Sequence, residues 1–269
     1  MTNTKPTFKG SLLVETPETI SQIGFLEGDF GQDFLQEYQG RVKADYAKAP
    51  VLDVLSYRDG VVKGSNPFAV VLANKILRKN GLRTASQADL EKALSFGVLP
   101  LRGTYEDPAL VLRTRQDPNS YLAGNLFDQL KAQGKRLKKN SAYVLWLRDL
   151  SLKADRNSPN GLSFAIPSDF IDYFEAPILN QVSQQRFESS DIESKTGIPA
   201  KVSSTGSRIL YTRNFAGYLV KNSGLVRSYL NGNLNLSSND GDLTYSDVNG
   251  RVVVRTSEAG APKIKGVKK

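Results

Sequence analysis

The hydrophobic pattern of the chain changes near Gly97, and this change constrains the fold more than any other feature. Before Gly97, apolar residues recur mostly at helical spacing. After it, short runs rich in β-branched and aromatic residues are typical of strands. The sequence therefore predicts an α+β protein, with a smaller, mostly helical region over residues 11–97 and a sheet-containing domain over residues 98–257.

Two helices in the first region have recognisable ends. Asn66 followed by Pro67 predicts a helix start, and Asn80-Gly81 predicts its end. Ser86 and Asp89 have the spacing of a capping box, which opens a short helix that ends at Gly97.

The second region combines one helix with several strands. The helix is expected to begin at Asp117-Pro118 and to stop at Gly134, with its leucines on one face. The strands are expected at residues 98–103, 109–114, 142–150, 161–166, 208–213 and 251–256.

The chain has neither histidine nor cysteine. This removes disulfides, thiolate metal sites, zinc hydrolases and Ser-His-Asp hydrolases, because each needs one of these residues. Carboxylate pairs remain, namely Asp149 with Asp155 and Asp191 with Glu193, but they are interpreted as solvated charges. We therefore expect no enzyme, no cofactor and no metal.

The net charge of +9 favours anionic partners. Part of it is local, in a basic cluster and in the tail. This pattern predicts nucleic-acid binding as an alternative function, and a solvated helix end with a disordered tail is the plainer interpretation. The basic residues are Lys131, Lys135, Arg136, Lys138 and Lys139 in the cluster, and Lys263, Lys265, Lys268 and Lys269 in the tail.

The two ends of the chain read as tails. Residues 1–10 lack the apolar core of a secretion signal and are expected to be disordered, as is the basic tail, residues 258–269. No run of about 18 apolar residues is present to cross a bilayer. A soluble, cytoplasmic protein without membrane insertion is the resulting expectation.

Residues 222–250 have an unusual composition, dominated by Asn, Ser, Asp, Tyr, Gly and Thr. Such a composition normally indicates a loop. However, leucines are spaced through it, and side chains alternate between Leu230 and Leu236. This alternation predicts a half-buried strand with asparagines on its outer face.

Lys, Glu, Gln, Met and Trp are all absent from residues 222–250. The genetic code offers a cause. The codon AAC, altered at its two adenines, yields Asn, Asp, Tyr, Ser, Thr, Gly and others, but never the five missing residues.

A C-terminal run of this kind, closing in Gly250-Arg251-Val252-Val253-Val254, resembles the variable protein of a diversity-generating retroelement, whose closing strand reads Gly-Phe-Arg-Val. The resemblance covers residues 208–256. It implies a C-type-lectin-like fold for residues 98–257 and a ligand-binding surface whose codons are rewritten at adenines.

The binding surface is predicted over residues 225–249, with a protein or another macromolecule as its ligand. Tyr supplies rigid contact area and small polar residues supply adaptable hydrogen bonds. The alternatives are a polar hairpin tip without a partner, or a Ca²⁺ site near Asp240 and Asp242. The predicted ligand-binding residues are Tyr229, Asn231, Asn233, Asn235, Ser237, Asn239, Asp240, Asp242, Tyr245, Asp247 and Asn249.

Overall fold

The computed structural model of the chain describes residues 14–16, 19–47, 49–138, 141–168, 173–181, 185–212 and 223–256. Residues 1–10, Lys139 and the tail from 258 to 269, with its four lysines, lie outside the described residues. The described part contains both helices and strands, so the α+β prediction is confirmed. None of its helices combines the length and hydropathy that a bilayer-spanning helix requires.

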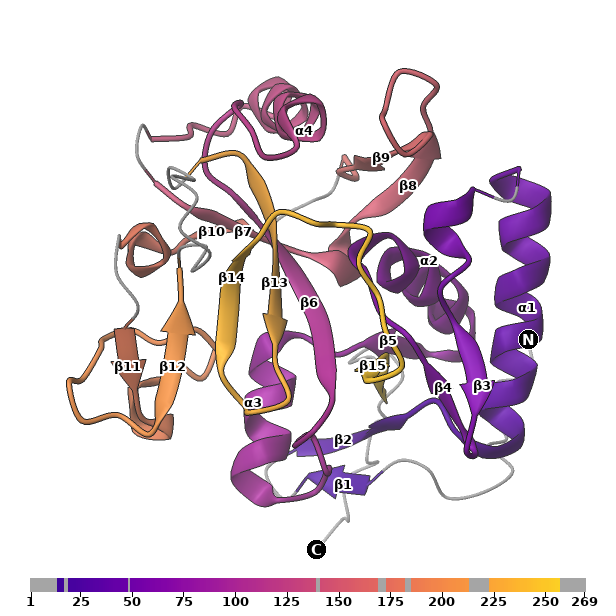
Figure 1. Ribbon diagram of the computed structural model, residues 1–269, viewed down its shortest axis with the longest axis horizontal. Coiled ribbons are helices and arrows are strands. Elements are labelled where there is room, and N and C mark those ends of the chain that lie inside the picture. The colour runs from indigo at the N-terminus through magenta and orange to yellow at the C-terminus, as the bar shows by residue number, and fades with distance from the viewer. Residues whose placement is uncertain are drawn as a thin grey trace, which may run out of the picture.

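A curled eight-stranded sheet occupies the centre of the molecule (Figure 1). Its strands follow the order β10-β7-β6-β13-β14-β12-β11, and β15 pairs with β6 alone. The β12–β14 and β15–β6 pairs are parallel, and the other pairs are antiparallel. The bounds are β6 Tyr105–Leu112, β7 Tyr143–Trp146, β10 Tyr173–Glu175, β11 Gln185–Phe187, β12 Arg208–Tyr211, β13 Leu225–Leu230, β14 Leu236–Asp240 and β15 Gly250–Arg251.

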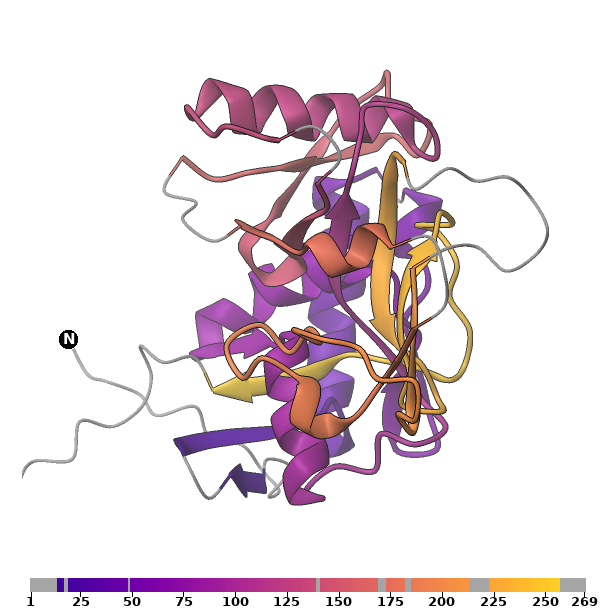
Figure 2. The ribbon, with the colours of Figure 1, turned by 90° about the vertical axis from the view of Figure 1, so that its left-hand side faces the viewer.

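A second sheet joins segments from opposite ends of the chain. Its order is β1-β2-β16-β5, so β16 (Val253–Thr256) lies between β2 (Thr19–Phe25) and β5 (Leu82–Thr84). Figure 2 shows the yellow β16 beside the indigo β2. The predicted boundary at residue 97 therefore does not separate two structural units. The strand β16, which follows residue 97, pairs with β2 and β5, which precede it. The remaining strands are β1 Val14–Thr16, and the hairpins β3 Ser56–Arg58 with β4 Val61–Lys63 and β8 Ser151–Ala154 with β9 Leu162–Ala165.

Two helices, α2 (Pro67–Leu77) and α3 (Gln87–Phe96), begin where the capping residues predict. Asn66 Oδ1 accepts a hydrogen bond from the Ala69 backbone nitrogen at 2.8 Å, and Ser86 forms a capping box with Asp89. Strands accompany these helices, so the region 11–97 is less helical than expected. The helices are α1 Gly28–Asp45, α2 Pro67–Leu77, α3 Gln87–Phe96 and α4 Ser120–Ala132, with short 3₁₀ turns η1 Pro50–Leu52, η2 Arg78–Asn80, η3 Leu147–Asp149, η4 Pro177–Asn180 and η5 Ser189–Asp191.

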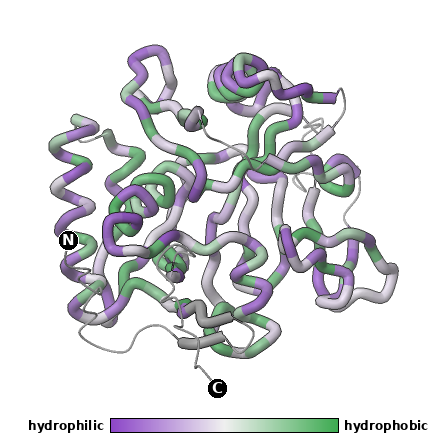
Figure 3. The backbone as a smooth tube through the Cα atoms, turned by 180° about the vertical axis from the view of Figure 1, so that it is seen from behind, coloured by the Kyte–Doolittle hydropathy of each residue, from purple (hydrophilic) through white to green (hydrophobic). Residues whose placement is uncertain are grey.

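One hydrophobic core connects the two regions of the sequence. The α2 helix is buried on almost all sides, and its Phe68 ring stacks on Phe164 of β9 with centroids 4.6 Å apart. The same core contains Leu110 of β6, Leu126 of α4 and Val254 of β16. Figure 3 shows hydrophobic segments in the interior, while α1 at the edge alternates between hydrophobic and hydrophilic residues. Burial of each large apolar side chain stabilises the fold by about 1.5–3 kcal/mol.

Three local predictions need correction. Residues 98–103 form no strand, since Leu99 and Leu101 pack in the core from a loop. The strand predicted over 142–150 ends at Trp146 and continues as η3. The helix predicted from Asp117-Pro118 begins at Ser120.

Candidate functional site

The segment predicted as one alternating strand, residues 230–236, instead contains a turn. Residues 231–235 connect β13 to β14, so that prediction is wrong. Asn231 Oδ1 accepts hydrogen bonds from the backbone nitrogens of Asn233, at 3.0 Å, and Asn235, at 3.1 Å. An asparagine that binds the backbone just ahead of it favours a turn over a continuous strand.

Two predicted ligand-binding side chains are buried. Asn235 is 7% exposed, and its Oδ1 accepts a hydrogen bond from the backbone nitrogen of Ile209 at 2.8 Å. Ser237 is 3% exposed and lies opposite Tyr229 in the β13–β14 ladder. The prediction that these two residues belong to the binding surface is therefore wrong, because their side chains lie inside the strand assembly.

The other predicted ligand-binding side chains are exposed to solvent to different degrees. Asn231 is accessible and also forms the hydrogen bonds of the turn. The half-exposed residues are Tyr229, Asn231, Asn239, Asp240 and Asp247, and the exposed ones are Asn233, Asp242, Tyr245 and Asn249.

Residues 241–249, here termed the C-terminal loop, connect β14 to β15 and are folded by their own aspartates. Asp242 Oδ1 accepts hydrogen bonds from the backbone nitrogens of Thr244, at 2.9 Å, and Tyr245, at 3.1 Å. Asp247 Oδ1 accepts another from the Asn249 backbone nitrogen at 2.7 Å. Short aspartate side chains thus replace the strand ladder that this segment lacks.

The C-terminal loop is also fixed to distant parts of the chain, and passes in front of β13 and β6 (Figure 1). The backbone nitrogen of Tyr105 donates to the Asn249 carbonyl at 3.1 Å, and the Tyr105 hydroxyl accepts from the Asp247 backbone nitrogen at 2.8 Å. Leu243 is buried beneath the loop. The Ser65 backbone nitrogen donates to Ser246 Oγ at 2.9 Å. Several of these contacts use the loop main chain. Of the exposed side chains of the loop, Tyr245 also contacts a distant residue, because its ring centroid lies 6.3 Å from that of Tyr105.

A buried arginine supports the same loop. Arg227 of β13 donates to both carboxylate oxygens of Asp107, at 2.8 and 2.9 Å, and to the Tyr245 carbonyl at 2.9 Å. Its guanidinium carbon lies 5.2, 4.8 and 5.7 Å from the ring centroids of Tyr105, Tyr229 and Tyr245. Such distances allow cation–π attraction, which is stronger in a desolvated setting. Arg227 therefore links the sheet, the tyrosines and the loop backbone.

The outer side of the C-terminal loop carries large apolar groups. Tyr245 is 49% exposed and Val248 is 48% exposed, and both are in this one loop. The same loop carries the polar side chains of Asp242, Asp247 and Asn249, and the Tyr245 hydroxyl donates to Asp247 Oδ2 at 2.7 Å. Exposed aromatic and apolar groups within a polar surround are typical of a contact surface for another molecule.

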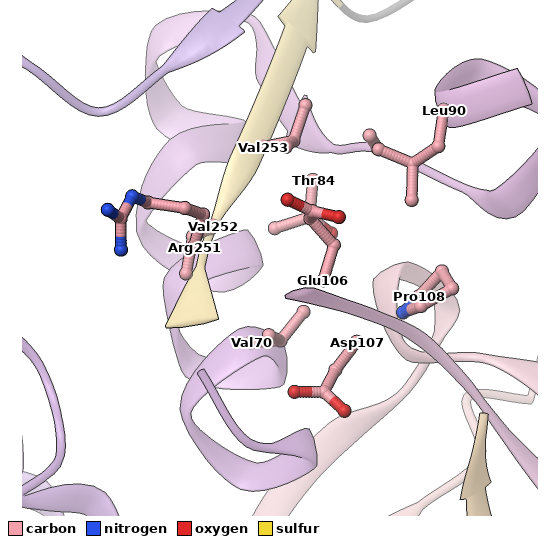
Figure 4. A pocket seen from close by; sticks show the side chains of 10 residues that line it. Val70, Thr84, Leu90, Glu106, Asp107, Pro108, Arg251, Val252 and Val253 are labelled. Carbon is pink, nitrogen blue, oxygen red and sulfur yellow. The ribbon is translucent and has the colours of Figure 1, made fainter. Parts of the chain in front are cut away.

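A small cavity lies behind the sheet, between β6, β5 and β16 (Figure 4). It has room for about one water molecule, with a volume of about 10 Å³. Glu106 lines it, and burial raises the pKa of this carboxyl to about 8, although the Thr104 hydroxyl donates to its Oε1 at 2.6 Å. Its other oxygen has no partner among the described residues. The cavity is too small for an organic ligand.

The carboxylate pairs considered in the sequence, Asp149 with Asp155 and Asp191 with Glu193, do not form a common site. Asp149 faces Arg78 and Arg148, while Asp155 accepts a hydrogen bond from the Tyr121 hydroxyl. Asp191 and Glu193 accept hydrogen bonds within their own turn. The described residues contain no cluster of three acidic side chains that could hold a metal ion, and Asp240 lies 3.9 Å from Arg227.

The basic cluster after α4 is spread along a helix end. Lys138 is paired with Glu175 at 2.7 Å, and Lys135 lies over the Tyr173 ring at 5.5 Å. Lys131 and Arg136 are exposed. Part of the predicted nucleic-acid surface is therefore engaged within the protein.

Sequence reasoning missed the residues that position the loop, namely Ser65, Tyr105, Asp107 and Arg227. Asn66 was predicted only as a helix cap, but its Nδ2 also donates to the Thr244 carbonyl of the loop at 3.3 Å. Arg227 and Asp107 are 120 residues apart, and neither belongs to a recognisable motif. No protein-family model, curated protein or solved structure matches this chain.

Proposed function

We propose that this chain is a ligand-binding protein rather than an enzyme, and that the solvent-accessible side chains within residues 225–249 form the binding surface for a macromolecular ligand. The proposal includes a C-type-lectin-like arrangement of residues 98–257 and a diversified surface, as in the variable proteins of diversity-generating retroelements. One observation carries it. The C-terminal loop is held by hydrogen bonds of its main chain, by the carboxylates of Asp242 and Asp247, by a buried leucine and by Arg227, while Val248 and about half of the Tyr245 side chain stay exposed.

This arrangement suits a surface whose side chains change. Substitutions at exposed positions away from special contacts usually alter stability by less than about 0.5 kcal/mol. Val248 and Asn249 can therefore vary while the backbone beneath them keeps its shape. A substitution of Tyr245 also removes its ring contacts with Arg227 and Tyr105 and the hydrogen bond that its hydroxyl donates to Asp247. Asn231, Asn235 and Ser237 are left out of the variable set, because their side chains hold the turn or lie between strands.

The genetic test uses the codons themselves. The gene and its neighbourhood are sequenced in many isolates, and a near-copy of the 222–250 coding segment is sought beside a reverse transcriptase. We expect adenine-directed differences at the codons of Asn233, Tyr245 and Asn249, and constant codons for Arg227 and Leu243. Differences spread evenly over all bases and positions would contradict diversification.

A matched pair of asparagines tests the separation between framework and surface. Asn231→Ala is expected to lower the free energy of unfolding by about 1–2 kcal/mol, because it leaves the turn nitrogens of Asn233 and Asn235 without their acceptor. Asn233→Ala removes the same atoms from an exposed side chain and is expected to change the free energy of unfolding by less than about 0.5 kcal/mol. Urea denaturation measures both, and equal losses would contradict the assignment.

Binding itself is tested by selection. Full-length chains randomised at Tyr245, Val248 and Asn249 are displayed and panned against an immobilised probe protein such as lysozyme. We expect folded binders to be recovered, with sequences at these three positions that differ from the starting chain. Failure to recover binders from a library whose members remain folded would count against a binding role for this loop.

A further inference from the structure

Four arginines from different elements lie close together beside the strands β5 and β16 of the second sheet. They are Arg78 of η2, Arg83 of β5, Arg148 of η3 and Arg255 of β16, here termed the arginine cluster. The carboxylates of Asp89 and Asp149 lie among them. Among the described residues, four guanidinium groups therefore surround two carboxylates.

The Asp89 carboxylate is already saturated. Its Oδ2 accepts hydrogen bonds from Arg83 at 2.7 Å and from the Ser86 backbone nitrogen and hydroxyl, both at 2.8 Å. Its Oδ1 accepts from Arg255 and, at 3.4 Å, from Arg83. A carboxylate offers about four lone-pair sites. A further arginine therefore finds no acceptor on Asp89.

Arg148 forms ion pairs with Asp89 and Asp149 but donates a hydrogen bond to neither. Its Nη1 lies 3.6 Å from Asp89 Oδ2, and its Nε lies 3.6 Å from Asp149 Oδ2. Both distances exceed a hydrogen bond. Within the described chain, the Arg148 side chain makes no hydrogen bond, although its carbonyl accepts from Asn74 and Arg78 at 2.6 Å each. Its side chain is 22% exposed, so its donors are within reach of solvent.

The positively charged arginines of the cluster repel one another. Burial lowers the pKa of Arg83, and repulsion from Arg148 and Arg255 lowers it further against the attraction of Asp89. An additional negative group would relieve this repulsion and supply the missing acceptors. A guanidinium binds oxyanions through two parallel hydrogen bonds.

We propose that the arginine cluster is a binding site for a phosphate-type oxyanion, with Arg148 as its bidentate donor and Arg78 as a second, more exposed cation. A single oxyanion fits better than a nucleic-acid backbone, because Arg83 and Arg255 are nearly buried and only Arg148 and Arg78 remain open. The site uses no residue of the C-terminal loop, so the test of this site is independent of the test of the proposed function.

Calorimetric titration of the full chain with inorganic phosphate tests this site, with chloride at equal ionic strength as the reference. We expect saturable binding with a Kd on the order of 1 mM or tighter, and at least about tenfold weaker binding for Arg148→Gln, as loss of a charge-assisted pair predicts. Arg148→Lys keeps the charge without the planar fork and is expected to be intermediate.

Arg156→Gln provides the matched control, since it removes the same charge from an exposed position outside the cluster. It is expected to bind phosphate as the unaltered chain does. Absence of saturable phosphate binding to the unaltered chain would overturn the proposal. So would equal binding by the Arg148 and Arg156 variants, or binding of a DNA oligonucleotide without binding of phosphate. If Arg148→Gln does not fold, the Lys variant and the unaltered chain still decide the question.

Discussion

Arg227→Met is expected to lower the free energy of unfolding by about 3–5 kcal/mol, because it leaves the Asp107 carboxylate buried without its cation. Ser65 donates to that carboxylate at 2.6 Å, but a hydroxyl does not balance a charge. The Tyr245 carbonyl loses its donor in the same variant. Urea denaturation with a constant m value measures the loss.

The double variant separates a lost ion pair from lost packing. Arg227→Met combined with Asp107→Leu removes both charges, and we expect it to recover much of the stability lost by Arg227→Met alone. Arg251→Met is a control, because that side chain is only half-buried and its hydrogen bonds are to carbonyl oxygens. A double variant less stable than Arg227→Met would show that Asp107 is not the source of the cost.

The same variant bears on the proposed surface. Amide hydrogen exchange of the C-terminal loop is expected to quicken in Arg227→Met, since this arginine binds the Tyr245 carbonyl.

Glu106→Gln is expected to abolish a large pH dependence of stability. Burial raises the pKa of Glu106 from 4.5 to about 8, so the folded state favours the neutral carboxyl. The neutral form contributes its full stability below pH 4.5, and this contribution falls as the pH rises through about 8. The free energy of unfolding should therefore decrease over this window by an amount on the order of 5 kcal/mol more than in the Gln variant.

Denaturation curves at a series of pH values test this difference. Glutamine keeps an oxygen that can accept a hydrogen bond from the Thr104 hydroxyl, so the variant preserves that contact. Glu37→Gln on α1 is the control, because that side chain is 40% exposed. Parallel pH profiles for the unaltered chain and Glu106→Gln would contradict a neutral buried carboxyl.

Local signals made part of the fold predictable. Asn66 and Pro67, and the pair Ser86 and Asp89, set the starts of α2 and α3, because capping depends on residues a few positions apart. Pairing between distant strands carries no such signal. The insertion of β16 between β2 and β5 was therefore missed, and with it the single core that crosses residue 97.

The site was predictable only in outline. Composition indicated a candidate surface near the C-terminus, and Tyr245 and Val248 of that segment are exposed, while its role in binding stays a prediction. The alternation of asparagines and leucines pointed to a strand, but Asn231 prefers to bind its own neighbours and makes a turn. Arg227 and Asp107 meet only in three dimensions, so their contribution could not be inferred from spacing.

The order of the second sheet has a consequence for biosynthesis. While the chain is being made, β2 and β5 leave the ribosome long before β16, the strand that joins them. Until then their facing edges have unpaired amide and carbonyl groups, which attract other extended segments. Nascent chains stalled before residue 253 should therefore be recognised by chaperones and cleaved by proteases.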